Sequence, residues 1–265
     1  MSMDYGYNLA AAGMLTAMFR QDVASNNLAN IETVGFKADS AFTIPRQAAR
    51  VEDRLHDIPS NKLLERLGAG VLLGPTRTSF VQGTLESTRN PLDLAIRGDG
   101  FLTVSARAGA RGTSQDHIRL TRDGRLTLNA DGTLVTIAGG RPVLDENGRA
   151  IRLDRSTRIE IDGDGTIRQA GGAVAKLRLV DVPNRQALRK AGEGLYMLTS
   201  NIAAGFTPAR GEIVQGHIEK SAVDVIDAMM KVQSAAGAVT ASGRMLSIHD
   251  ELTGRLINTL GRASA

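Results

Sequence analysis

The chain has 265 residues, a net charge of +4 and a hydrophobic content of 42%, but aromatic residues make up 3% and both cysteine and tryptophan are absent. This length allows one large or two modest globular domains. The missing cysteine excludes disulfides, thiolate metal sites and a cysteine nucleophile. The low aromatic content argues against a large apolar pocket and against a platform for stacking nucleic-acid bases.

Positive charge is spread along the chain in close alternation with acidic residues, as in residues 119–125. This pattern favours solvated strand faces over a nucleic-acid or lipid surface. Residues 1–7 lack the basic and apolar regions of a cleavable secretory signal, and no segment approaches the roughly 20 apolar residues that span a bilayer. We therefore expect no membrane span, and any export to proceed without a cleaved signal.

The N-terminal segment, residues 3–35, has apolar residues at helical spacing. They are Tyr7, Ala11, Met14, Leu15, Met18, Phe19 and Val23. Asn26, Asn27 and Asn30 are poor helix formers, so the helix should end near residues 28–30. Gly35 permits a turn, and an extended piece starts at Phe36.

Residues 37–74 contain a polar, charged stretch and one short amphipathic piece. A loop of this length is unusual inside a compact domain. We interpret the segment as an extended connector or arm that packs on a neighbour.

From residue 75 to residue 219 the pattern is that of β structure. Four turn pairs lie between apolar runs, and such pairs are a strong signal for hairpins. They are Asp123-Gly124, Asp131-Gly132, Asn147-Gly148 and Asp164-Gly165. A near repeat, residues 81–87 and 214–220, brackets this region and suggests that the strands entering and leaving it lie side by side.

The C-terminal segment, residues 222–260, has apolar residues at alternating steps of four and three, which is coiled-coil spacing. The stripe runs through Val225, Met229, Val232, Ala236, Val239, Gly243 and Leu246. Ser221 with Asp224 is the expected N-cap. Because Ala236 and Gly243 weaken the seam, this helix needs partner surfaces from the N-terminal helix and from neighbouring subunits.

Together these elements predict an α+β fold. Residues 1–36 and 220–265 form a coiled-coil-like helical domain of paired terminal helices, residues 37–74 form the connector, and residues 75–219 form a mostly antiparallel β domain inserted between the helices.

No pattern in the sequence calls for catalysis. The four histidines, His56, His117, His217 and His249, occur in separate contexts without metal-ligand spacing. Asp162 and Asp164 lack the further carboxylates of a calcium loop, so a hairpin turn is the better interpretation. Phosphate-loop and dinucleotide fingerprints are missing. We therefore predict no catalytic, cofactor or metal site.

One long motif resembles a known family. Residues 26–37, Asn-Asn-Leu-Ala-Asn-Ile-Glu-Thr-Val-Gly-Phe-Lys, are similar to the N-terminal signature of bacterial flagellar axial proteins, which form rod, hook and hook-filament junction. Residues 91–101, 121–126 and 139–143 resemble the β domain of the longer members, and residues 215–225 resemble the approach to their C-terminal helix.

The length of the chain is similar to that of the larger proximal rod protein or the distal rod protein, with the distal type slightly favoured. Two departures bear on the position along the rod. Ala222 stands where the family usually has Asn, and residues 233–237 read Gln-Ser-Ala-Ala-Gly where it has Gln-Arg-Ala-Tyr-Glu.

The resemblance implies a structural subunit with a helical inner-core domain and a β outer domain. Such subunits are exported unfolded by the flagellar type III apparatus and polymerise helically into a hollow drive shaft. The implied partners are other copies, other rod proteins, the hook protein, the surrounding rings and the export apparatus, with no nucleic acid. As a hypothesis, the terminal helices fold only on assembly.

We assign assembly roles to residues of the motif and of the C-terminal stripe. They are Asn26, Asn27, Leu28, Asn30, Gly35, Phe36, Val225, Met229, Val232, Val239 and Leu246. The asparagines should turn the chain out of the helix by side-chain to backbone hydrogen bonds, and Phe36 should anchor its exit. The alternatives are a secreted β-rich binding module or adhesin on a helical stalk and a β-rich hydrolase.

Overall fold

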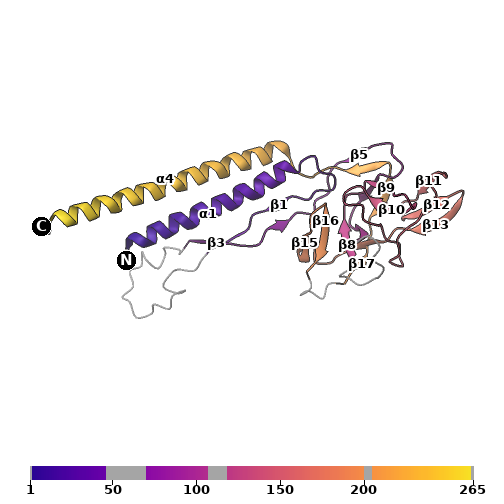
Figure 1. Cartoon of the computed structure of the whole chain (residues 1–265), viewed down its shortest axis with the longest axis horizontal. Coiled ribbons are helices and arrows are strands. Elements are labelled where there is room, and N and C mark those ends of the chain that lie inside the picture. Colours follow the sequence, from indigo (N-terminus) through magenta and orange to yellow (C-terminus); the bar gives the residue numbers. More distant parts are fainter. Residues whose placement is uncertain (1, 46–69, 107–117, 200–204, 264–265) are drawn as a thin grey trace. The chain divides into compact units, whose positions relative to one another are not determined.

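The computed structural model describes residues 2–45, 70–106, 118–199 and 205–263. They form an α+β fold with a long helix near each end and short strands between them (Figure 1). The chain divides into two compact units. The helical unit comprises residues 1–29, 39–78 and 224–265, and the β unit comprises residues 30–38 and 79–223.

The helical unit contains α1 (Ser2–Ala29) and α4 (Val225–Ala263). The end of α1 agrees with the prediction. Asp224 caps α4, because its Oδ1 accepts a hydrogen bond of 2.8 Å from the amide of Asp227. The prediction that Ser221 shares this role is wrong, since its hydroxyl accepts from the amide of Val223, ahead of the helix. Neither helix is long and apolar enough, over its described residues, to cross a membrane.

Small residues line the contact between α1 and α4, which lie side by side (Figure 1). A Cβ added to Gly6 would lie 2.8 Å from His249 Cε1, and one added to Gly13 would lie 3.9 Å from Ser242 Oγ. The contact thus moves from residue 6 to residue 13 on α1 while it moves from residue 249 to residue 242 on α4. The helices are therefore antiparallel. The buried alanines follow the same spacing: Ala10, Ala17 and Ala24 on α1, and Ala228 and Ala235 on α4. Such residues let two helices approach closely.

Four short strands complete the helical unit. β1 (Asp39–Ser40) pairs with β4 (Arg77–Thr78), and β2 (Thr43–Pro45) pairs with β3 (Val71–Leu73), both antiparallel. The two ends of the predicted connector therefore form two-stranded ladders. Its middle, residues 46–69 with His56, lies outside the described residues, as does His117 in the β unit.

The largest sheet of the β unit has six strands. In spatial order they are β15 (Leu188–Lys190), β16 (Leu195–Leu198), β8 (Ile118–Thr121), β7 (Phe101–Ser105), β14 (Leu179–Asp181) and β17 (Thr207–Pro208). A short 3-10 helix, η2 (Arg185–Ala187), precedes β15. The smaller sheets pair β9 (Leu126–Leu128) with β10 (Leu134–Thr136), and join β11 (Ile159–Ile161), β12 (Thr166–Gln169) and β13 (Gly172–Lys176).

The predicted turn pairs have different outcomes. Asp131-Gly132 joins β9 to β10 and Asp164-Gly165 joins β11 to β12, each in a hairpin with positive φ at the glycine. Asn147-Gly148 forms a tight turn, closed by a bridge between Leu144 and Ala150. The hairpin predicted at Asp123-Gly124 is wrong, because β8 and β9 belong to different sheets. Gly124 allows a close approach instead, since a Cβ there would lie 1.6 Å from the backbone oxygen of Leu94.

The near repeat brings the entry and exit of the β unit together, as predicted. β5 (Leu85–Ser87) pairs antiparallel with β19 (His217–Glu219), and β6 (Leu94–Arg97) pairs with β18 (Glu212–Gln215).

The core of the β unit consists of two clusters of buried aliphatic side chains. The larger is built around Leu102, Leu134 and Ile167, and the second around Phe101, Leu120 and Val180. Phe80, Phe101 and Tyr196 pack against one another with ring centroids 5.5–5.7 Å apart. Because most large apolar side chains of the strands are buried here, this unit has a hydrophobic core of its own.

Candidate assembly surface

Many of the large apolar side chains of α1 and α4 are exposed. On α1 the exposed ones are Tyr7, Leu9, Leu15 and Met18. On α4 they are Val225, Ile226, Met229, Met230, Met245, Ile248, Leu252, Leu256 and Ile257. Many exposed apolar side chains on one structural unit indicate an interaction surface. We call these thirteen residues the apolar helix surface.

The last turns of α4 have no α1 beside them. His249 of α4 lies next to Gly6 of α1. Past this contact α4 continues through residues 250–263, whereas α1 continues through residues 2–5, so α4 extends further. Leu252, Leu256 and Ile257, in or near this extension, have 49%, 44% and 66% of their surface exposed. Such side chains in a helix gain packing only from another molecule or another part of the chain.

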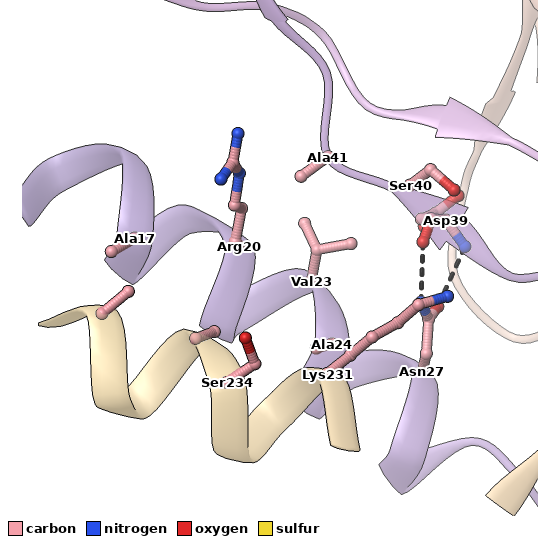
Figure 2. Close-up of a pocket in the computed structure, with 12 residues that line it drawn as sticks. Ala17, Arg20, Val23, Ala24, Asn27, Asp39, Ser40, Ala41, Lys231 and Ser234 are labelled. Atoms are coloured by element: carbon pink, nitrogen blue, oxygen red, sulfur yellow. Dashed lines mark hydrogen bonds between the residues drawn. The ribbon is translucent and has the colours of Figure 1, made fainter. Parts of the chain in front are cut away.

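The predicted asparagines lie at the end of α1 and in the turn that follows. Asn27 is buried; its Nδ2 donates to the backbone oxygen of Asp39 at 2.7 Å, and the Asp39 amide donates to Asn27 Oδ1 at 2.9 Å (Figure 2). Asn30 accepts from the amide of Thr33 at 3.2 Å through its backbone oxygen and from the Thr33 hydroxyl at 3.1 Å through Oδ1. Asn26 is exposed on the last turn of α1, and Leu28 is half-buried.

The other two motif residues hold the chain against the β unit. Gly35 has a φ of +69°, and its amide donates to the backbone oxygen of Glu219 at 2.7 Å. Phe36 is half-buried, with Lys190 Nζ 4.0 Å from its ring centroid. That lysine also donates to the backbone oxygen of Lys37 at 2.6 Å.

The predicted seam residues of α4 occupy two environments. Val232, Val239 and Leu246 are half-buried and share a helix face with the buried alanines. Val225 and Met229 are 51% and 57% exposed and belong to the apolar helix surface. Their role in assembly stays a prediction.

A hollow of about 330 Å³ lies between the C-terminal half of α1, the start of α4 and the segment that contains β1 (Figure 2). Its walls include Ala17, Ala24 and Ala238, with the longer side chains of Arg20 and Lys231 along it. Lys231 is engaged with Asp227 on its own helix at 2.6 Å.

Sequence reasoning missed a buried charge cluster in the β unit. Lys37, Arg122 and Glu219 have side chains that are 1%, 3% and 1% exposed, and both cations contact the carboxylate. Burial lowers the pKa of Lys37 below its ordinary value, against the opposing hydrogen bond and charge of Glu219. A long-range pair of this kind leaves no local signal in the sequence.

Among the residues that the structure describes, no three His, Asp or Glu side chains come together as a metal site would require. Asp162 and Asp164 instead flank the β11–β12 turn and pair with Arg168 at 2.7 Å and Lys176 at 3.7 Å.

Two family descriptions match separate parts of the chain. "Flagella basal body rod protein" matches residues 8–37, which contain most of α1 and the turn as far as Lys37. "Flagellar hook protein FlgE/F/G D1 domain" matches residues 95–169, which begin in β6 and end in β12.

Relatives match nearly the whole chain. The chain is 30% identical to flagellar basal-body rod protein FlgF of Caulobacter vibrioides, across 98% of this chain and 99% of the relative. It is 27% identical to flagellar basal-body rod protein FlgG of the same organism, across 92% and 94%. It is 29% identical to the FlgG rod protein of Bacillus subtilis, across 93% and 96%. The chain is therefore a structural protein, not an enzyme, and belongs to the flagellar basal-body rod protein family.

Proposed function

We propose that this chain is a structural subunit of a bacterial flagellar rod and polymerises helically through its helical unit into a hollow shaft. The shaft transmits torque and conducts exported subunits. The observation that carries the proposal is the exposure of side chains on α1 and α4. The apolar side chains that the helices bury fully are alanines, whereas thirteen large apolar side chains form the exposed apolar helix surface.

The energetics favour contacts between copies. Covering the exposed half of one Ile, Leu or Met side chain contributes roughly 1 kcal/mol. Several such side chains on each subunit offset the loss of freedom on association. For a rod, the contact must join different surfaces of neighbouring copies, because such head-to-tail contacts continue into an open helical filament.

The terminal helices fold fully only on assembly. The apolar side chains that α1 and α4 bury fully are alanines, and Val232, Val239 and Leu246 are half-buried, so the pair by itself gains little free energy from folding. Contacts between copies supply the remainder. This coupling suits a subunit that is exported unfolded.

The proposed place of the chain is the rod of the flagellar basal body, reached through the flagellar type III apparatus without a cleaved signal. Its partners are other copies, other rod proteins, the hook protein and the surrounding rings. The relatives named above are rod proteins, which supports this location. The distal position is slightly preferred over the proximal one, and complementation of strains that lack either rod protein distinguishes the two.

The test compares two adjacent exposed positions of α4. Ile248→Asp places a charge on the apolar helix surface, whereas Ser247→Asp places the same charge on an exposed polar position. We expect Ile248→Asp to abolish rods in a strain that depends on this chain, and Ser247→Asp to support them. Rods of normal length and number from Ile248→Asp, with the variant present in them, would overturn the proposal.

A further inference from the structure

Three charged side chains meet in the interior of the β unit. Lys37 Nζ lies 2.5 Å from Glu219 Oε1, and Arg122 Nη1 lies 3.1 Å from Glu219 Oε2. A buried charge is costly unless it is paired and hydrogen-bonded. The position of each of these groups therefore depends on the other two.

Backbone groups add hydrogen bonds to each of the three side chains. Lys37 Nζ donates to the Val81 oxygen at 2.7 Å, and Arg122 Nη2 donates to the Gly98 oxygen at 2.8 Å. The Gly83 amide donates to Glu219 Oε1 at 2.9 Å. Gly83 has no room for a side chain, since a Cβ there would lie 1.9 Å from the Lys220 oxygen.

The cluster has a net positive charge, because two cations share one carboxylate. Without Lys37, Arg122 and Glu219 still form a neutral pair. Without Glu219, Arg122 stays buried as an unpaired cation, and Lys37 beside it either repels that charge or loses its proton; both cost free energy. The anion is therefore the critical member.

The critical member also comes last in the chain. Lys37, Val81, Gly83, Gly98 and Arg122 all precede β19, whereas Glu219 ends it, 182 positions after Lys37. The backbone oxygen of Glu219 accepts the hydrogen bond from the Gly35 amide, so one residue of β19 holds both the turn and the lysine that follow α1.

We propose that Glu219 is a positioning residue that makes the docking of residues 35–37 onto the β unit conditional on β19. Until β19 pairs with β5, Lys37 has no buried anion to meet, and the segment after α1 stays undocked. When β19 is in place, the segment that leaves α1 and the strand that leads to α4 become fixed in one step. This coupling is separate from polymerisation and can be tested in the monomer.

The test is amide hydrogen exchange on the full-length monomer, resolved to single residues. The Gly35 amide is the reporter, because it donates to the backbone oxygen of Glu219. A change of the Glu219 side chain leaves that oxygen in place. We expect Glu219→Gln to speed exchange at Gly35 at least a hundredfold, while amides of β7 keep their protection. Lys37→Met should change Gly35 exchange less than tenfold, since the Arg122–Glu219 pair remains.

The double variant Lys37→Met/Glu219→Gln completes the test. It removes the cost of the buried lysine and leaves Arg122 as the one unpaired cation, so we expect Gly35 to exchange at least tenfold more slowly than in Glu219→Gln alone. If Glu219→Gln also removes protection from the amides of β7, the single and double variants are compared in the same way. We then expect the double variant to restore the protection of β7. Equal Gly35 exchange in wild type and Glu219→Gln, or no difference between the single and double variants, would overturn the proposal.

Discussion

Lys37 and Glu219 form a buried ion pair of 2.5 Å across 182 positions of the chain. Lys37 ends the motif that begins in the last turn of α1, and Glu219 ends the last strand before α4. The two connections of the β unit to the terminal helices are therefore tied to each other inside that unit. This pair, together with Gly35 and Arg122, explains why the motif extends beyond the helix.

The conformation of Gly35 should be essential for this arrangement. It combines a φ of +69° with a backbone so close that a Cβ would lie 2.5 Å from the carbonyl carbon of Arg122. Gly171 has a similar φ of +80° but nothing within 4 Å. We expect Gly35→Ala to lower the free energy of unfolding of the β unit by about 3 kcal/mol, and the matched control Gly171→Ala by about 1 kcal/mol. Denaturant unfolding checks this, and equal losses would contradict the close approach.

The pH dependence of stability should reveal the buried lysine. The ordinary pKa of a lysine side chain is 10.5, and burial lowers the pKa of Lys37 below that value in the folded protein. The unfolded chain therefore binds this proton more tightly than the folded protein does. The associated stability is fully present above pH 10.5 and is lost as pH falls through the lowered pKa. We therefore expect the free energy of unfolding of wild type, minus that of Lys37→Met, to rise as pH is raised from neutral toward 10.5.

Lys176 is the matched control for that experiment. Its pKa is raised by hydrogen bonding to Glu146 and by the charges of Glu146 and Asp164, so its contribution is present below the ordinary pKa and lost at higher pH. Because Lys176 is exposed, solvent screens the effect. The corresponding difference for Lys176→Met should fall slightly over the same range, and a slope of the same sign as for Lys37→Met would contradict the assignment.

A charge in the contact between the helices should block assembly without unfolding the strands. Val232 is half-buried on the face of α4 that carries Ala228 and Ala235. We expect Val232→Asp to abolish polymerisation and to leave the near-ultraviolet circular dichroism of the β unit unchanged. Gln233→Asp, one position along on the exposed side, should polymerise normally. Normal rods from Val232→Asp would contradict the seam assignment.

Limited proteolysis of the monomer should distinguish the two units. The apolar side chains that the two helices bury fully are alanines, whereas the β unit has two clusters of large buried apolar side chains. We expect both ends to be digested first, leaving a protected fragment close to residues 79–223. A full-length chain that resists protease would show that α1 and α4 stabilise each other sufficiently without other copies.

Local chemistry accounts for what the sequence predicts well. The asparagines mark the end of α1, and turn pairs at Gly132 and Gly165 mark hairpins, because each depends on a few adjacent residues. Gly124 carries the same turn signal but serves a close approach to Leu94, thirty positions earlier in the chain. A local pattern cannot distinguish these two uses of glycine.

The near repeat gives a second case in which a local pattern does not distinguish two environments. Glu86 and Glu219 occupy equivalent positions in the two copies. Glu86 is exposed and pairs with Lys220 at 2.6 Å, whereas Glu219 is buried between two cations. In the predicted stripe of α4, Val232, Val239 and Leu246 share a face with the buried alanines, whereas Val225 and Met229 are exposed. The stripe follows the large apolar residues, because they carry the periodic signal, while alanines occupy the fully buried positions.

Thiol labelling of α4 tests the central claim most directly, because the natural chain contains no cysteine. Ile248→Cys and Leu252→Cys place single thiols on the apolar helix surface. We expect both thiols to react readily in the monomer, at least tenfold more slowly in isolated rods, and readily again after the rods are dissolved in guanidinium, which controls for intact thiols. Equal reactivity in rods and monomer would show that this surface stays open in the polymer and would contradict assembly through the terminal helices.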